Sequence, residues 1–532
     1  MTWGLTREAS SPCRLSSGQR QVRWPVARRV EGRVDPHCRV DAPAVLRAPT
    51  LPDCETKPRN EEDLMTSSKN VLAVFCDELT RRALSCYGNP DTNTPNIDRF
   101  AARAVRFDNA CSTYPVCVPF RFTLMTGETA QSRHIPAIGY RMSPAERTIA
   151  DEFKSHDYET IYIGKWHLEG GQNALPATRR TQFEPPPLSR AHLRNWDRFI
   201  YWARTNSYVN DMYYVDSDPT PVHPQTHQVD TIFGQARHAL ETRRCPDKPF
   251  FCMVSTNAPH PAYRPPAEYA ARWKDRPVTI PENVAPAYRE ELGALPQHEI
   301  DRYHEHLESG ELKTRMRLYY AMVEHVDREF GELMCWLEER GLTNNTAILF
   351  FADHGELLGN HGLTYCKQFP FEESIGIPLF IADPNLESED GLAIEAPACT
   401  EDLYPTMLGL AGLEPSKRVP GVDLSSWWMP GKAKPTREAV LLGFFGEARP
   451  HASLHGYTWR GVRSSRFLYS VYGGSHEAAR PWHFYDLQRD PLQLHNLIHD
   501  PRWRNEIAGH REWLKTLLRE VDDHYPLADP TG

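Results

Sequence analysis

The sequence predicts an α/β protein in which a large, mostly parallel sheet lies between helices, followed by a small C-terminal α+β subdomain. Short apolar runs such as Val71–Cys76 have the length and composition of strands that are buried on both faces. Segments with apolar residues at helical spacing alternate with these runs, which is the order typical of a sheet covered by helices on both faces. The 532 residues, of which 40% are hydrophobic, are enough to bury a large core.

Each expected element has a local signal. Apolar runs predict strands at 71–76, 160–163, 250–255, 347–351 and 378–381. A helix is expected to begin at Thr94-Pro95, because Thr94 can cap it and Pro95 suits its first position. Helical spacing of apolar residues predicts two more helices at 229–240 and 319–337, and Gly341 is expected to end the second.

The chain is expected to fall into three parts. Residues 1–64 are rich in Pro and Arg without periodicity, and we expect a disordered extension or a mis-assigned start, with folding from near Met65. Residues 65–430 carry the α/β pattern. From about residue 431 to 532, short aromatic-rich strands and an amphipathic helix near 503–521 predict the α+β subdomain.

Composition excludes some classes of protein. The net charge of −9 argues against a nucleic-acid partner, because such proteins normally carry a basic face. We find no apolar run near the length of a membrane span and no apolar segment of a secretory signal at the start, so no membrane partner is expected. The twelve Cys form no Cys-x-x-Cys pair, and we expect a reduced, cytoplasmic protein that needs no disulfides.

The run from Cys117 to Gly127 is the most informative segment. It reads Cys-Val-Pro-Phe-Arg-Phe-Thr-Leu-Met-Thr-Gly, with Pro119 suited to a first helical turn and Arg121 one turn after the cysteine. A plain interpretation is a half-buried thiol at the start of a helix. The combination of Cys-x-Pro-x-Arg with the Leu-x-Thr-Gly tail favours a functional motif.

Polar side chains follow four of the predicted strands. In open α/β sheets ligands bind at the carboxyl ends of the strands, so side chains that follow several strands meet at one edge. One such residue has a plain reading as solvation or helix capping, but several together predict a metal or anion site. The residues concerned are Asp77, Glu78, Lys165, His167, His260, Asp353 and His354.

Residue chemistry separates these side chains into two groups. Asp77, Glu78, Asp353 and His354 together would form an oxygen-rich divalent site suited to Ca²⁺ or Mg²⁺, and the imidazole leaves Mn²⁺ or Zn²⁺ open. The basic residues suit a tetrahedral anion, because fixed positive charge stabilises the extra negative charge of its transition state. This basic group comprises Lys165, His167, His260 and Lys367.

Over nearly all of residues 65–532, the chain resembles the sulfatase family. The segments that carry the resemblance are Asn70 to Leu79, Thr94-Pro95-Asn96-Ile97-Asp98, Cys117 to Gly127, Tyr158 to His167, Ala258-Pro259-His260-Pro261, Ala352-Asp353-His354-Gly355-Glu356, Lys367 to Ser374 and Phe484 to Leu497. The chain departs from the family pattern at Glu78, where Asp is usual, at Phe120, where a small residue is usual, and at Asp157, where Gly is usual. The resemblance implies an alkaline-phosphatase-like fold and hydrolysis of sulfate esters.

The resemblance also implies a mechanism. Cys117 would be oxidised to formylglycine by a formylglycine-generating enzyme, and the metal would be bound by Asp77, Glu78, Asp353, His354 and residue 117. One hydroxyl of the hydrate would attack sulfur and the second would be deprotonated to expel sulfate. Arg121 would hold the hydrate, while Lys165, His167, His260 and Lys367 would neutralise sulfate and protonate the leaving alcohol. His134 is a second-tier candidate that could face the site.

Two alternatives to a sulfatase stay open at this point. The nearest is a phosphonate monoester hydrolase or phosphodiesterase of the same superfamily, because phosphate and sulfate esters are both tetrahedral anions. A second is an unmodified, non-catalytic homologue. For the substrate we favour a small carbohydrate or aryl sulfate. The aromatic segment from Trp196 to Tyr214 would either stack on a sugar or, as we favour, pack in the core.

Overall fold

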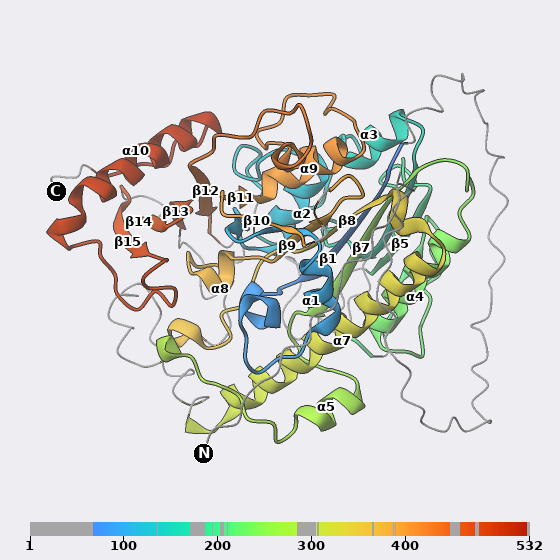
Figure 1. Ribbon diagram of the computed structural model, residues 1–532, viewed down its shortest axis with the longest axis horizontal. Coiled ribbons are helices and arrows are strands. Elements are labelled where there is room, and N and C mark those ends of the chain that lie inside the picture. Colours follow the sequence, from blue (N-terminus) through green and yellow to red (C-terminus); the bar gives the residue numbers. More distant parts are fainter. Residues whose placement is uncertain are drawn as a thin grey trace, which may run out of the picture.

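A central mixed sheet forms the body of the protein in the computed structural model (Figure 1). The structure describes residues 68–528, except 136, 171–186, 194, 203–206, 210, 285–304, 306–307, 364–366, 387, 389, 447–457 and 474–477. The sheet has nine strands. Their spatial order is β10 (Leu392–Ile394), β2 (Val105–Phe107), β9 (Leu379–Ala382), β8 (Thr346–Ala352), β1 (Asn70–Asp77), β7 (Phe250–Pro259), β4 (Glu159–Lys165), β5 (Arg198–Trp202) and β6 (Tyr214–Val215).

The middle of this sheet is parallel. Strand β1 lies between β8 and β7 and pairs parallel to both, and β4 and β5 continue the parallel order. All eight residues of β1 are buried, as expected for a strand covered on both faces. The predicted strands at 71–76, 160–163, 250–255 and 347–351 are therefore confirmed. The predicted strand at 378–381 also forms, but β9 runs antiparallel to β8.

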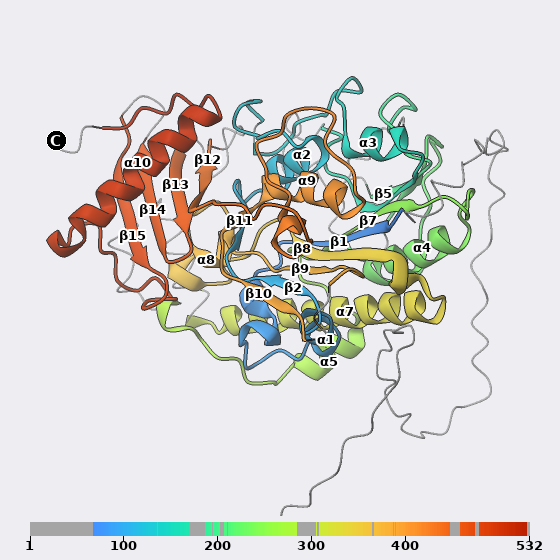
Figure 2. The same cartoon turned by 45° about the horizontal axis from the view of Figure 1, so that its top comes forward.

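Helices cover both faces of the sheet (Figures 1 and 2). One layer comprises α2 (Cys117–Thr126), α3 (Ile149–Ser155) and α9 (Thr400–Leu410). The other comprises α1 (Pro95–Ala101), α4 (Gln228–Glu241), α5 (Ala267–Trp273) and α7 (Glu311–Glu339). The short helix α8 (Glu372–Ile375) precedes β9. The predicted helices near 94–104, 229–240 and 319–337 are confirmed, and α7 begins several residues earlier than its apolar spacing predicts.

The C-terminal part is a four-stranded antiparallel sheet with α10 (Arg504–Glu520) packed along it (Figure 2). The strands follow chain order and are β12 (Ala439–Phe444), β13 (Thr458–Ser464), β14 (Phe467–Gly473) and β15 (Arg480–Asp486). Residues of β12 to β15 such as Val440 and Trp459 belong to the same hydrophobic core as the central sheet. The α+β character is confirmed, whereas the residue boundary at 430/431 stays a prediction.

Four further expectations from the sequence concern the N-terminal segment, the aromatic segment, the cysteines and membrane helices. Residues 1–64 lie outside the described residues. Among the aromatics, Phe199, Tyr201 and Trp202 are buried in the core, as the favoured interpretation expects. Cys245 is disulfide-bonded, so the expectation of a fully reduced chain is wrong there. Within the described residues, no helix combines the length and apolar composition needed to cross a membrane.

Candidate active site

The first residue of α2 is Cys117, and the whole helix is buried. Its ten residues are apolar on nearly every side, which is the pattern of a helix enclosed in a core. The helix ends at Gly127, whose left-handed backbone (φ +70°) closes the last turn as glycine does at this position. The side chains of Cys117 and Arg121 are thus fixed one turn apart and directed into the protein.

A carboxylate and an imidazole from the ends of two neighbouring strands meet the Cys117 thiol. Its Sγ lies 3.4 Å from Oδ1 of Asp77, which ends β1, and 3.1 Å from Nε2 of His354, which follows β8. His354 Nε2 is 3.5 Å from Oδ1 of Asp353. The donor atoms of these four residues all lie within 4.8 Å of one another.

The tautomer of His354 suits a metal ligand. Its Nδ1 lies 2.9 Å from the carbonyl oxygen of Gly355, which can only accept, so Nδ1 carries the proton. In the neutral imidazole, which is the form that binds a metal, Nε2 would present a lone pair toward the carboxylates of Asp77 and Asp353. Three acceptors that converge in this way repel one another unless positive charge lies between them, and a divalent cation fits that requirement.

Arg121 holds the two carboxylates from the other side. Its Nη2 lies 3.1 Å from Oδ2 of Asp77 and 3.1 Å from Oδ2 of Asp353, and the side chain is 1% exposed. Nη1 donates to the carbonyl of Lys165 at 2.6 Å and to Oγ of Ser255 at 2.8 Å. The guanidinium thereby ties α2 to the ends of β1, β4 and β8 and to Ser255 in the middle of β7.

Lys165 and Asp77 form a buried ion pair. Although burial alone would raise the pKa of Asp77, the charges of Lys165 and other basic neighbours hold it well below its usual range. The opposite holds for Cys117, because burial, and then the negative charge of Asp77, raises the pKa of the thiol to about 12. The unmodified side chain is thus a neutral thiol at neutral pH.

A second cluster adjoins the first. Oε2 of Glu78 lies 2.8 Å from Nζ of Lys367 and 3.0 Å from Nε2 of His260, and Nζ lies 3.0 Å from Nε2. Lys367 Nζ is also 3.5 Å from Sγ of Cys117, so the two clusters touch. Burial, and then the charge of Lys367, lowers the pKa of His260 to about 3, so this imidazole is neutral. Burial raises the pKa of Glu78 to about 7 against the pull of Lys367 and His260.

The structure brings together most of the residues singled out in the sequence. Joined by the contacts above are Asp77, Glu78, Cys117, Arg121, Lys165, His260, Asp353, His354 and Lys367. His167 is buried two residues after Lys165, with a left-handed backbone (φ +59°). His134 is exposed on the turn after α2, and its second-tier role at the site stays a prediction.

Several supporting residues escaped the sequence analysis. The hydroxyl of Tyr319 accepts from Thr80 N at 3.1 Å and donates to the carbonyl of Glu78 at 2.8 Å. The hydroxyl of Tyr208 lies 3.0 Å from the carbonyl of Asn257, near His260. Ser255, which accepts from Arg121, is the last residue of the predicted strand at 250–255, and this position could have marked it as a site residue. The two tyrosines lie in segments far from any motif.

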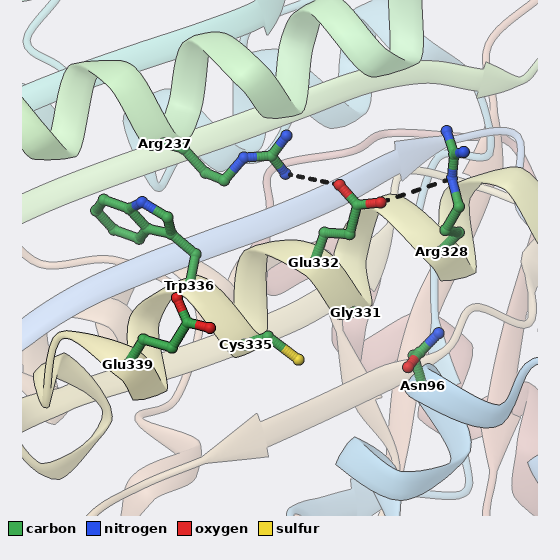
Figure 3. Close-up of a pocket in the computed structure, with 8 residues that line it drawn as sticks. All are labelled: Asn96, Arg237, Arg328, Gly331, Glu332, Cys335, Trp336 and Glu339. Atoms are coloured by element: carbon green, nitrogen blue, oxygen red, sulfur yellow. Dashed lines mark ion pairs between the residues drawn. The ribbon is translucent and has the colours of Figure 1, made fainter. Parts of the chain in front are cut away.

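A surface groove on the outer side of α7 is a separate feature (Figure 3). Its volume is about 420 Å³. Glu332 there lies between Arg237 at 3.6 Å and Arg328 at 3.9 Å, beside Trp336. These charges pair with one another, and none of the residues around Cys117 lines the groove.

Comparison with protein families gives two matches. A family model described as sulfatase matches residues 69–413, and one described as the C-terminal part of N-sulphoglucosamine sulphohydrolase matches residues 359–520. An ulvan-active sulfatase of Formosa agariphila is 28% identical over 90% of this chain and 87% of its own. An N-acetylglucosamine-6-O-sulfatase of Bacteroides thetaiotaomicron is 25% identical over 91% of each chain.

Solved structures share the fold. A protein solved with its substrate D-glucosamine-2-N,6-O-disulfate has a TM-score of 0.72 and 22% identity, covering 86% of this chain and 99% of the other. The phosphonate monoester hydrolase of Agrobacterium radiobacter has a TM-score of 0.67 and 22% identity, covering 85% of this chain and 96% of its own.

Proposed function

The chain belongs to the sulfatase family and is a sulfuric ester hydrolase, and we propose that it cleaves sulfate esters with a formylglycine made from Cys117 and a divalent cation. One observation carries this proposal. The Cys117 side chain, at the first residue of a buried helix, touches Asp77, His354 and Lys367 at once. A structural cysteine has no need of such a charged surrounding.

Formylglycine would supply the nucleophile, because its hydrate offers one hydroxyl to attack sulfur and a second whose deprotonation expels sulfate. The chain contributes the placement of that group. Residue 117 lies at the N-terminal end of α2, where unpaired backbone N–H groups and the helix dipole favour negative charge. A formylglycine-generating enzyme is the partner that this step requires during maturation.

The cation would be held by Asp77, Asp353 and His354, with the oxygen of modified residue 117 as a further ligand. Two carboxylates favour calcium as the first candidate, with Mg²⁺, Mn²⁺ or Zn²⁺ as alternatives that the imidazole allows. A bound cation would polarise the nucleophile and offset the negative charge of the sulfuryl group. Arg121 keeps both carboxylates in place from behind.

Basic residues would bind the rest of the ester. Lys165 pairs with Asp77, and Lys367 contacts Cys117 itself. Both ammonium groups would neutralise sulfate oxygens. His167 would add to this basic lining. The ammonium of Lys367, which lies 3.0 Å from Nε2 of the neutral His260, would protonate the alcohol as the S–O bond breaks.

We propose a small sulfated carbohydrate as the substrate, with aryl sulfates as artificial substrates. The support comes from relatives: one is named as an N-acetylglucosamine-6-O-sulfatase, and one structural neighbour was solved with glucosamine disulfate. The name of the first and the bound substrate of the second both point to small sulfated sugars.

Turnover of 4-nitrophenyl sulfate and of glucosamine 6-sulfate by protein co-produced with a formylglycine-generating enzyme tests this function. The Cys117→Ala variant is expected to lose nearly all activity, while Cys335→Ala, at an exposed free cysteine on α7, is expected to keep it. Equal rates for Cys117→Ala and the wild type would refute the proposed nucleophile.

Phosphonate monoester hydrolysis is the second candidate, favoured by the structural likeness to an enzyme of that name. Rates on phenyl phenylphosphonate and on 4-nitrophenyl sulfate separate the two functions. We expect a higher kcat/KM on the sulfate; the reverse order would move the assignment to phosphonate esters.

A further inference from the structure

Glu78 follows Asp77 directly in the chain, yet the two side chains have different partners. Oδ1 of Asp77 faces the Cys117 thiol, in the group of four donors that suits a cation. Oε2 of Glu78 instead contacts Lys367 at 2.8 Å and His260 at 3.0 Å. The donor atoms of Asp77, Glu78 and His260 also lie within 4.8 Å of one another. Asp77 therefore belongs both to this group of three and to the group of four around Cys117.

The backbone of Glu78 has an unusual conformation that two hydrogen bonds hold in place. It has a left-handed conformation (φ +66°), at the place where the pairing of β1 with β7 becomes irregular after Cys76. Its N–H donates to Oδ1 of Asp353 at 3.0 Å, and its carbonyl accepts from the Tyr319 hydroxyl at 2.8 Å. Non-glycine residues rarely adopt this conformation without such support.

The space in front of the Glu78 carboxylate already holds positive charge. The Lys367 ammonium donates to Oε2 and lies 3.0 Å from His260 Nε2, so these three atoms form a triangle with sides of 2.8 to 3.0 Å. His260 Nδ1 bonds the carbonyl of Pro261, which leaves Nε2 directed into the triangle. A divalent cation on the same oxygen would face the ammonium at close range, and like charges so placed repel strongly.

We propose that Glu78 is a positioning residue that holds Lys367 and His260 in place, and that it is not a ligand of the cation. This inference rests on the proposed function. The side chain of Glu is one methylene longer than that of Asp, which lets its carboxylate reach past the four-donor group to Lys367. Without this carboxylate, the buried ammonium of Lys367 loses its ion-pair partner and is no longer fixed beside the leaving group.

The test compares Glu78→Gln with Asp353→Asn, which makes the same carboxylate-to-amide change inside the four-donor group. Each holoenzyme is desalted into metal-free buffer, and bound divalent metal per chain is measured by mass spectrometry of the elements. We expect Glu78→Gln to retain the wild-type amount of metal and Asp353→Asn to lose most of it. Loss of metal from Glu78→Gln to the same extent as from Asp353→Asn would overturn the proposal.

A second readout uses aryl sulfates whose leaving groups differ in acidity: 4-nitrophenyl, phenyl and 4-methoxyphenyl sulfate. A poor leaving group depends more on protonation, so kcat/KM of Glu78→Gln relative to wild type is expected to fall by less than about 10-fold on the nitrophenyl ester and about 10²-fold on the methoxyphenyl ester. An equal loss on all three esters would overturn the positioning role. Glu78→Asp, which is too short to reach Lys367, is expected to show the same trend.

The failure of the proposed function would look different. If the formylglycine-containing wild type bound metal but hydrolysed none of the three esters, the proposed function would be wrong. The metal contents of Glu78→Gln and Asp353→Asn would still decide whether Glu78 is a ligand. Thermal unfolding of each variant in metal-free buffer confirms that a loss of metal does not reflect a loss of fold.

Discussion

Sγ of Cys117 lies 3.1 Å from Nε2 of His354, although 237 residues separate them in the chain. The contact depends on the start of α2 lying over the carboxyl end of β8, which pairs with β1 in the middle of the sheet. A cysteine oxidised at this position would therefore carry its oxygen beside the His354 imidazole and the carboxylates of Asp77 and Asp353.

Removal of Arg121 is expected to destabilise the protein strongly. Arg121→Ala would leave the buried carboxylates of Asp77 and Asp353 without their shared partner, at a cost of about 3–5 kcal/mol in the free energy of unfolding. Urea unfolding in metal-free buffer measures this cost. Lys515→Ala, which removes a solvent-exposed ion pair with Glu512, is the control and is expected to cost under about 1 kcal/mol.

Metal binding is expected to stabilise the fold. A ligand that binds only the folded chain at 100 times its Kd adds about 2.7 kcal/mol, so calcium added to chelator-treated wild type should raise Tm by several degrees. Asp353→Asn is expected to lose this response because it removes one of the donors around Cys117. An equal rise in Tm for both proteins would place the cation elsewhere.

Stability is expected to fall in acid through Glu372. Burial alone would raise its pKa, but Arg463 of the C-terminal sheet and Arg81 of the α/β domain lower it to about 2. A lowered folded pKa means that the stabilisation is complete above the unfolded value, about 4.3, and is lost as the pH falls toward 2. The loss is about 3 kcal/mol at most. Urea unfolding at pH 5 and pH 3 should show that the free energy of unfolding falls less between these pH values for Glu372→Gln than for wild type.

Gly164 is expected to tolerate no side chain. It has φ +116°, and a Cβ there would lie 1.9 Å from the carbonyl oxygen of Ser255 on the neighbouring strand. Gly164→Ala should cost at least about 2 kcal/mol and disturb Lys165 next to it. Gly234→Ala is the matched control, because its Cβ would meet nothing within 4 Å inside α4, and it should stabilise by about 0.5–1 kcal/mol. Chemical unfolding of both variants checks the contrast.

Much of the fold follows from local pattern. Strands β1, β4, β7 and β8 are apolar runs, and a parallel sheet brings their carboxyl ends together, so Asp77, Lys165, His260 and Asp353 could be placed at one edge from the sequence. The antiparallel direction of β9 could not, because an apolar run has no signal of direction. The cytoplasmic location and the start near Met65 stay predictions.

The finer arrangement of the site depends on backbone conformation and distant contacts. Nothing local marks the left-handed conformation of Glu78, which separates its side chain from that of Asp77 and relies on Tyr319 of α7. The position of His134 depends on the course of the chain after Gly127, which leads to the surface. Spacing along the chain predicts neither.

The most direct test is the mass of the peptide that contains residue 117. Protein co-produced with a formylglycine-generating enzyme is alkylated and digested. We expect a peptide that is about 18 Da lighter than the same peptide with free cysteine and that reacts, as an aldehyde does, with a hydrazide. A preparation that hydrolyses sulfate esters at its full rate, but in which residue 117 is found only as alkylated cysteine, would contradict a formylglycine nucleophile at this position.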